Sequence, residues 1–236
     1  MTDYSALEQT LVSTLGLNRA PVAVAFLDAP PAGVEKFAGV EPSGCSFWRL
    51  AAAGRAFYTV PADHHGCVIG SHTHNMPLPA ERSRELPEML GFMTGIGYIR
   101  PAEVPSIPTL PRTPGAVVYA PLAATPVPPD VVIFAGRPGR LMLLQEAALR
   151  AGVSTQMPAL GRPTCMALPA ALTHGLITSS GCIGNRVYTD LGEDELYVVV
   201  AARDLPRIAE AAATIAAANT QLLAHHRERR RTLATE

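Results

Sequence analysis

The sequence predicts an α/β fold, a mixed sheet flanked by helices and built from two related halves with pseudo-two-fold duplication. Three observations lead to this prediction. Strand-length apolar runs alternate with segments of helical periodicity along the 236 residues. A cysteine-bearing segment recurs in the second half of the chain. The composition, with 48% hydrophobic and 17% charged residues, is typical of a globular protein with a sizeable core.

The first half of the chain alternates short helices and strands. Residues 4–17 predict an amphipathic helix, because Leu7, Leu11 and Leu15 recur on one face and Gly16 favours a helix end. The following elements are expected to be a strand at 21–27, a short helix at 46–53 and a strand at 56–60. The segment 63–70 is compatible with either a helix or a loop.

The rest of the chain continues the alternation after an irregular Pro-rich connector, residues 77–114, which could hold a lid or a pocket wall. The expected elements are a broken helix at 81–92, strands at 115–120, 131–135 and 196–202, and helices at 140–151 and 204–232. Asp204 is a favourable N-cap for the last helix. We therefore expect residues 1–236 to form a single domain.

The most informative feature is an internal near-repeat. Each copy begins at a cysteine, Cys45 or Cys165, and continues through an Ala-rich helix and a strand to a second cysteine, Cys67 or Cys182. The half-repeats cover approximately residues 20–75 and 115–190. Two such units commonly pack about a two-fold axis, which would bring all four thiols together. The alternative is a chance similarity between two short βα units.

Four converging thiols suit a metal centre. Cys45, Cys67, Cys165 and Cys182 could hold a [4Fe–4S] cluster, a [2Fe–2S] cluster or a tetrahedral zinc ion. We favour [4Fe–4S], because the wide cysteine spacing on a large core is unlike a small zinc-stapled loop, and zinc remains the alternative. Cys45 and Cys165 precede helices, whose dipoles should lower the pKa of these thiols. The neighbouring glycines would admit a bulky centre and offer N–H donors to sulfur; they are Gly66, Gly70, Gly181 and Gly184.

Candidate acid–base residues lie close to the second cysteine of each copy. Four of the seven histidines fall between Asp63 and His74, and imidazole serves both as a metal ligand and as a proton carrier. We predict direct chemistry for His64 and His74, with Asp63 beside them. Arg186, which follows Cys182 closely, is expected to balance the charge of a thiolate centre or to anchor a substrate.

These features support three functional hypotheses. The first is a cytoplasmic iron–sulfur protein that transfers electrons or performs Lewis-acid or sulfur chemistry on a small molecule. The second is a thiol-based or zinc enzyme with a Cys/His site. The third is a small-ligand-binding regulatory module whose Pro-rich connector closes over a pocket. The residues leave it open whether the protein is an enzyme.

Charge and hydropathy restrict the expected partners. The formal net charge is −1, so we expect no nucleic acid partner. No apolar run approaches membrane-spanning length, and the first residues lack the features of a secretory signal. The expected partners are a small-molecule substrate or a redox partner protein, and a homo-oligomer is possible.

The ordered motifs resemble an uncharacterised prokaryotic family called domain of unknown function 169. The similarity covers roughly residues 20–205 and runs through Pro21, Cys45, Gly54, Cys67, Gly70, Pro121, Cys165, Cys182, Gly184, Arg186 and Glu195. The resemblance implies that all four cysteines belong to the family pattern, together with Asp63, Gly70, Gly184 and Arg186. It implies no activity.

Overall fold

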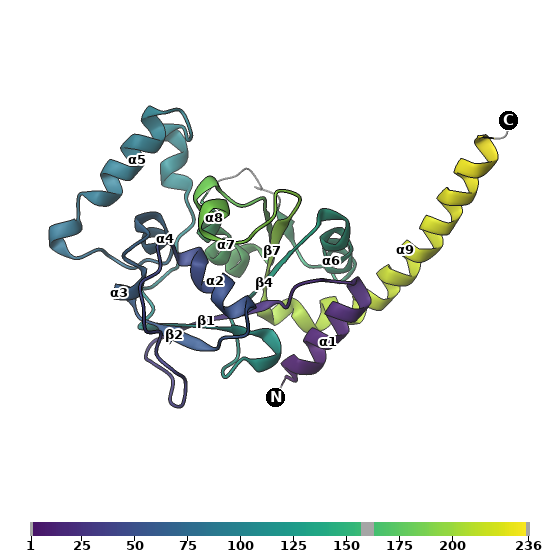
Figure 1. Ribbon diagram of the computed structural model, residues 1–236, viewed down its shortest axis with the longest axis horizontal. Coiled ribbons are helices and arrows are strands. Elements are labelled where there is room, and N and C mark those ends of the chain that lie inside the picture. Colours follow the sequence, from purple (N-terminus) through teal and green to yellow (C-terminus); the bar gives the residue numbers. More distant parts are fainter. Residues whose placement is uncertain (1, 157–162, 235–236) are drawn as a thin grey trace.

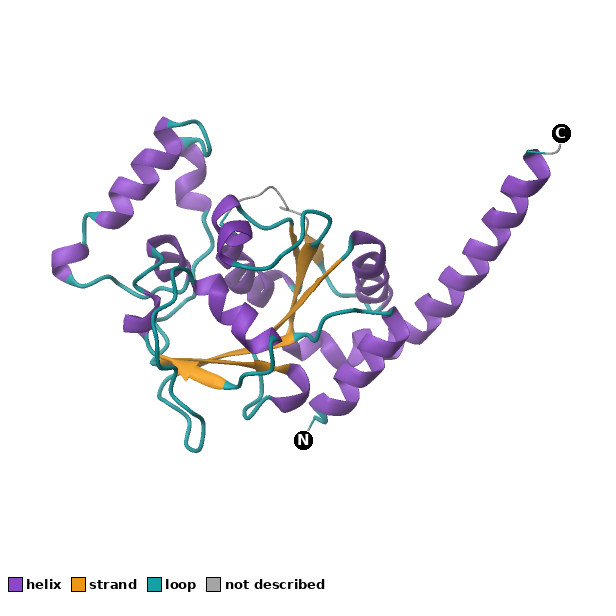
Figure 2. Cartoon of the chain, viewed as in Figure 1, coloured by secondary structure: helices purple, strands orange, loops and turns teal. Residues whose placement is uncertain are grey.

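The computed structural model describes residues 2–156 and 163–234. Within these ranges, helices surround one twisted sheet (Figures 1 and 2). The strands are β1 (Val22–Leu27), β2 (Phe57–Thr59), β3 (Ala116–Pro121), β4 (Val131–Gly136), β5 (Thr155–Gln156), β6 (Leu176–Ser179) and β7 (Leu196–Ala201). The α-helices are α1 (Tyr4–Leu15), α2 (Gly44–Ala52), α3 (Pro61–His64), α4 (Val68–Thr73), α5 (Glu85–Gly95), α6 (Pro138–Arg150), α7 (Ala167–His174), α8 (Ile183–Tyr188) and α9 (Leu205–Leu233).

The sheet has the strand order β2-β3-β1-β4-β7-β6-β5. The pairings from β2 to β6 are antiparallel, and β5 pairs with β6 in parallel over two residues. The α/β class and the mixed sheet are therefore confirmed. The alternation of strands and helices suggested that neighbouring strands would be parallel. Among the named strands, only β5 and β6 pair in parallel, because the other neighbours in the sheet run in opposite directions.

Two hydrophobic layers cover the two faces of the sheet. Side chains of β4 alternate between them: Val132 and Phe134 pack under α1, α6 and α9, whereas Val131 and Ile133 pack under α2 and α7. This is the two-residue period of a strand buried on both faces. Because the layer with α2 and α7 carries the segments around Cys45 and Cys165, the site is built on that face.

Most predicted elements are present, with ends shifted by one to three residues. Helix α1 ends where the sequence indicated, because Gly16 has a φ of 64° and caps the helix. The ambiguous segment after residue 60 forms the two short helices α3 and α4. The connector 77–114 contains α5, which projects from the sheet (Figure 1). This arm is anchored by Met93 and Ile99, which are buried in a small cluster with Ile69 of α4.

Helix α9 packs on the sheet only along its first turns. Its buried residues are Leu205, Ile208, Ala209 and Ala212, and its C-terminal half extends away from the body of the protein (Figure 1). In the two ranges that the structure describes, no helix is both long and apolar enough to cross a membrane.

Candidate functional site

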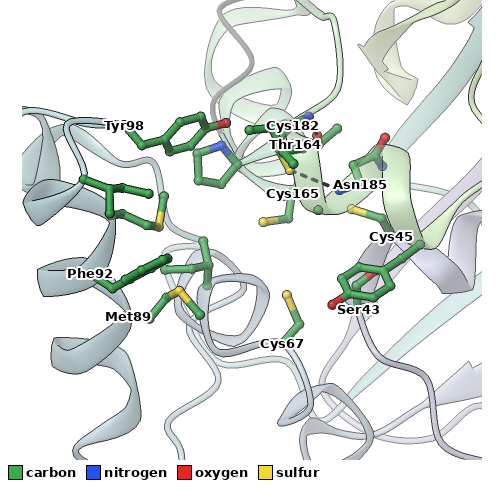
Figure 3. A pocket seen from close by; sticks show the side chains of 17 residues that line it. Ser43, Cys45, Cys67, Met89, Phe92, Tyr98, Thr164, Cys165, Cys182 and Asn185 are labelled. Carbon is green, nitrogen blue, oxygen red and sulfur yellow. Dashed lines mark hydrogen bonds between the residues drawn. The ribbon is translucent and has the colours of Figure 1, made fainter. Parts of the chain in front are cut away.

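The four cysteines line a single cavity of about 360 Å³. Figure 3 shows their side chains around a common space, with Met89 and Phe92 of α5 on the opposite side. The cysteines reach this space from separate segments, at α2, α4, α8 and the 3₁₀ turn η4 (Thr164–Met166). Among the described residues, no group of three His, Cys, Asp or Glu side chains could hold a metal ion; the four sulfurs border a shared space.

Cys67 and Cys182 have the same local structure. Each is the N-cap of a short helix, α4 or α8, and its sulfur accepts a hydrogen bond from the backbone N–H three residues later. Gly70 donates to Cys67 Sγ at 3.3 Å, and Asn185 donates to Cys182 Sγ at 3.4 Å. Such N–H groups stabilise a thiolate and orient it, so both sulfurs are held in place by their own helices.

Cys45 and Cys165 form the buried side of the site, with exposed fractions of 5% and 4%. Burial raises the pKa of the Cys45 thiol well above its usual value, and the neighbouring thiols, Cys165 foremost, raise it further, while a hydrogen bond from Asn185 opposes the shift. Burial and Cys67 also raise the pKa of Cys165. The expectation that these pKa values would be lowered is therefore wrong, because burial and the neighbouring thiols raise them.

Hydroxyl groups connect the cysteine segments. Thr164 Oγ1 accepts a hydrogen bond from the backbone N–H of Cys182 at 2.7 Å, which fixes Cys182 beside the turn that carries Cys165. The hydroxyl of Thr73, on α4, donates to the carbonyl oxygen of Gly70 at 3.0 Å and lies close enough to Cys165 to lower the pKa of its thiol, against the effect of burial.

The four predicted glycines fill different roles. A Cβ on Gly66 would lie 2.9 Å from the carbonyl oxygen of Glu41, and a Cβ on Gly70 would lie 3.1 Å from Cys67 Sγ. Gly181 has a φ of 77°, and a Cβ there would meet Asn185 Oδ1 at 2.9 Å. Gly184 lines the cavity, and its nearest contact would be Tyr188 at 3.8 Å. Only Gly70 therefore leaves space directly against a cysteine sulfur.

This difference predicts the outcome of two alanine substitutions. Gly70→Ala places a methyl group against Cys67 Sγ, and for the metal centre that the sequence predicts it should lower metal retention by about tenfold. Gly184→Ala is the matched control, because its methyl group would make only an ordinary contact. Iron measured after gel filtration checks both variants, and equal iron in the two would contradict the expected role of Gly70.

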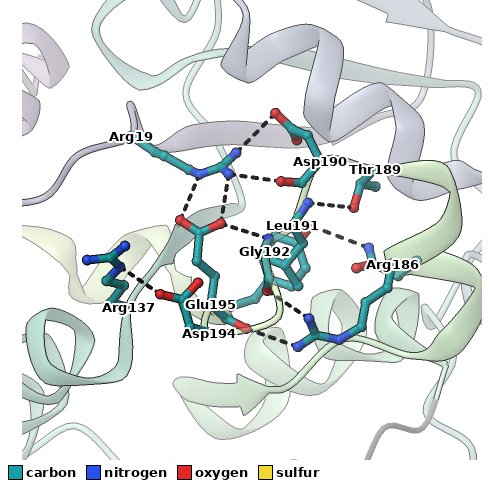
Figure 4. Close-up of polar contacts among 11 residues, drawn as sticks. Arg19, Arg137, Arg186, Thr189, Asp190, Leu191, Gly192, Asp194 and Glu195 are labelled. Atoms are coloured by element: carbon teal, nitrogen blue, oxygen red, sulfur yellow. Dashed lines mark hydrogen bonds and ion pairs between the residues drawn. The ribbon is translucent and has the colours of Figure 1, made fainter.

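Arg186 binds backbone and lies outside the cavity lining. Its guanidinium donates to the carbonyl oxygens of Gly192 at 2.8 Å and Glu195 at 3.0 Å, and also to that of Ser180 (Figure 4). These bonds fasten the loop after α8 to the segment that leads into Cys182. The structure therefore gives Arg186 a positioning contact, and the predicted direct role in charge balance or substrate anchoring stays a prediction.

A second arginine, which the sequence did not indicate, holds the same loop. Arg19 Nη2 lies 2.7 Å from Glu195 Oε2, and Glu195 is only 8% exposed (Figure 4). Glu195 Oε2 also accepts the backbone N–H of Gly192 at 2.9 Å. The partners lie far apart in the chain, so no local pattern in the sequence could identify this contact.

The predicted acid–base residues do not line the cavity. Asp63 accepts the backbone N–H of Val60 at 2.8 Å and so caps α3. His64 is buried beside Tyr119 and His74 beside Phe26, and the ring centroids of the two histidines are 5.7 Å apart. Thr59 Oγ1 lies 2.8 Å from His64 Nε2, while both ring nitrogens of His74 are buried and have no hydrogen-bond partner among the residues that the structure describes. A direct chemical role for these residues stays a prediction.

The connector 77–114 forms an apolar wall of the cavity, as its sequence allowed, but the side chains that form the wall were not predicted. Met89, Phe92 and Met93 of α5 and its C-cap residue Ile96 line the cavity, together with Ile183 of α8. Their three- and four-residue spacing on a helix was the available signal. This signal is normally read as a core-facing stripe, yet Phe92 and Ile96 are 60% and 61% exposed.

Comparison with known proteins agrees with the ordered motifs. The family DUF169, described as uncharacterised ArCR, matches residues 10–211. The chain belongs to the DUF169 family. No curated protein and no solved structure matches it. The matched residues of this DUF169 protein include all four cysteines, the cavity and the α5 arm, but the family carries no assigned activity.

The buried histidines predict acid sensitivity in this DUF169 protein. Burial lowers the pKa of His74 from 6.5 to about 4 and lowers that of His64 as well. Below pH 6.5, His74 is therefore protonated in the unfolded chain, whereas in the folded chain it stays neutral until about pH 4. Acidification through this window should reduce the free energy of unfolding by about 3 kcal/mol through His74 alone.

Urea unfolding between pH 7.5 and pH 4 measures this loss, and His74→Phe should reduce it. The control is His225→Phe, since His225 is exposed on α9. A His74→Phe variant that keeps the full acid sensitivity would rule out His74 as its source.

Proposed function

We propose that Cys45, Cys67, Cys165 and Cys182 ligate an iron–sulfur cluster, with [4Fe–4S] favoured. The observation that carries the proposal is the meeting of all four cysteine side chains at one cavity, although they come from separate segments of the fold. Four cysteines are the usual ligand set of such clusters. The N–H groups of Gly70 and Asn185 that point at sulfur suit the same role.

The size of the shared space supports a cluster over zinc. A single zinc ion binds four cysteine sulfurs, each at about 2.3 Å, so the sulfurs must converge on one point. A cluster instead occupies volume between its ligands, and the cysteines here border an open space at one end of a cavity of about 360 Å³.

The buried thiols also favour a metal centre over thiol catalysis. A nucleophilic cysteine needs a lowered pKa and a nearby base. Burial raises the pKa of Cys45 and Cys165, and His64 and His74 lie outside the cavity lining. Metal ions would offset the raised pKa of these thiols, because they displace the thiol protons and neutralise the charge of the thiolates.

When bound, such a cluster would supply one-electron transfer or, with one iron lacking a protein ligand, Lewis-acid or sulfur chemistry on a small molecule. The chain itself would hold the cluster through its cysteines and shield it with the buried side of the site. The proposal includes a cytoplasmic location, where thiols remain reduced, and either a small-molecule substrate or a redox partner protein.

The proposal also includes a pseudo-two-fold duplication about the β1–β4 pair. A line between β1 and β4 divides the sheet, with β1, β3 and β2 on one side and β4, β7 and β6 on the other. Both sides share the path strand, helix, strand, cysteine-capped helix (α4 or α8), strand, with α3 and α5 added in the first side. The half-repeats expected from the sequence, approximately 20–75 and 115–190, assign β3 to the second half, whereas the strand order groups β3 with β1 and β2. The proposed halves therefore become 22–121 and 131–201, with α6 and β5 inserted in the second.

Superposition of the two halves in an experimental structure tests the duplication. It should place Cys45 on Cys165 and Cys67 on Cys182. Failure of either cysteine pair to coincide would contradict the proposed symmetry.

Anaerobic purification from iron-replete cells tests the cluster. We expect brown protein with about four iron and four sulfide per chain and an electron paramagnetic resonance signal after reduction. Protein that is colourless and contains zinc alone would overturn the proposal in favour of the zinc alternative. Protein free of both metals, even after anaerobic reconstitution with iron and sulfide, would exclude a metal centre.

A further inference from the structure

The cavity has two chemically different ends. The cysteines form one end, and the other is a wedge between two helices, α5 and α8, lined by Met89, Phe92 and Ile96 on one side and Ile183 on the other. Figure 3 shows Met89 and Phe92 directed across the space toward the cysteines. The cavity therefore extends beyond the sulfurs to the projecting arm. A group bound to the sulfurs would leave the volume near α5 open to a second molecule.

The wedge is apolar and partly open. Phe92, Ile96 and Ile183 are 60%, 61% and 68% exposed. Apolar side chains gathered at the mouth of a concave site are typical of ligand binding. The arm does not lie free, because Met93 and Ile99 are buried against Ile69, so the wedge is already formed in the protein.

The lining restricts the chemistry of the occupant. Among the described residues that line the cavity there is no Asp, Glu, Lys, Arg or His. A charged molecule would lose its hydration there without meeting an opposite charge, which is costly. The cavity volume of about 360 Å³ falls in the range of small-molecule sites.

We propose that the wedge between α5 and α8 binds a neutral, apolar organic molecule, aromatic or branched, with one end against the cysteine site. This inference rests on the proposed function in one respect, since it assigns this molecule as the substrate or ligand of the cluster. The concave shape of the wedge favours a small molecule as occupant over the apolar surface of a second protein chain.

The test uses the full-length protein and a matched pair of probes. The neutral probe is 1-naphthalenemethanol, and its anionic counterpart is 1-naphthoate. Isothermal titration calorimetry should show saturable binding of the alcohol and at least roughly tenfold weaker binding of the carboxylate. Equal affinity for the two probes, or no binding of the alcohol, would overturn the inference.

Two variants locate the binding site. Phe92→Asp and Ile96→Asp place a charge in the wedge at exposed positions, so the fold should tolerate them, and each should weaken binding of the alcohol by about tenfold. Val40→Asp is the matched control, because Val40 is 93% exposed and lies outside the cavity lining. Unchanged binding in both wedge variants would overturn the assignment, as would a dimer in gel filtration that Phe92→Asp dissociates.

Iron measured in the same samples separates this inference from the cluster proposal. Loss of probe binding with iron retained is the expected result for the wedge variants. Wild-type protein that contains iron but binds no alcohol refutes only the wedge ligand. Protein that binds the alcohol but never acquires iron refutes only the cluster.

Discussion

Replacement of any one of the four cysteines with serine should reduce bound iron to less than about a tenth of the wild-type content. Cys45, Cys67, Cys165 and Cys182 all line the same cavity, and a serine hydroxyl is a poor ligand for iron at neutral pH. We expect all four variants to lose iron alike, because each would remove one of the four ligands of the proposed cluster. Iron and sulfide assays on anaerobically purified protein measure the effect.

Ser43→Ala is the control for the cysteine variants. Ser43 lines the same cavity and carries no sulfur, so its removal should leave the iron content unchanged. Cys67 and Cys182 are only partly buried, so serine there should change the free energy of unfolding little. Wild-type iron content in any one of the four variants would contradict ligation by four cysteines.

Arg186→Ala should lower the free energy of unfolding by about 3 kcal/mol. The substitution removes the guanidinium that binds the carbonyl oxygens of Ser180, Gly192 and Glu195. Arg186→Lys should recover only part of this loss, because one ammonium cannot reproduce a planar fork with several donors. Both variants should also bind less iron, since the loop that leads into Cys182 loses its anchor. Urea unfolding and iron assays measure the two effects.

Arg137→Ala is the matched control, because Arg137, at the N-cap of α6, contacts the same loop through Asp194. Arg137 Nε lies 2.9 Å from Asp194 Oδ2, but the two side chains are 71% and 66% exposed. An exposed ion pair contributes less than about 1 kcal/mol. A stable Arg186→Ala variant that retains iron and loses only affinity for a ligand would instead support the substrate-anchoring role that the sequence suggested.

Local patterns were sufficient to predict most elements of the fold. The leucine spacing and Gly16 predict α1 and its end, and the apolar runs predict β1, β3, β4 and β7 to within one residue at each end. These signals lie within a few residues of each other, so they act regardless of the rest of the chain. Strand order has no such local signal, which is why the mostly antiparallel sheet was not predicted.

The site was only partly predictable for the same reason. The repeat of cysteines identified the four thiols, because a duplicated pattern is visible in one sequence. The surroundings of each group were not visible. His64 and His74 resemble catalytic bases in the sequence but lie in the core, and Arg186 resembles a substrate anchor but binds three carbonyls.

The amino-acid sequence by itself determined the candidate site residues of this protein: four thiols, the glycines beside them and the helices that they precede or cap. Only the tertiary structure decided what these groups face. It directed the thiols toward one cavity, raised the pKa of two of them by burial, and placed the α5 arm opposite as an apolar wall. The physical reason is that burial, electrostatic coupling and cavity shape depend on segments distant in the chain, whereas helix ends and strand runs depend on neighbours.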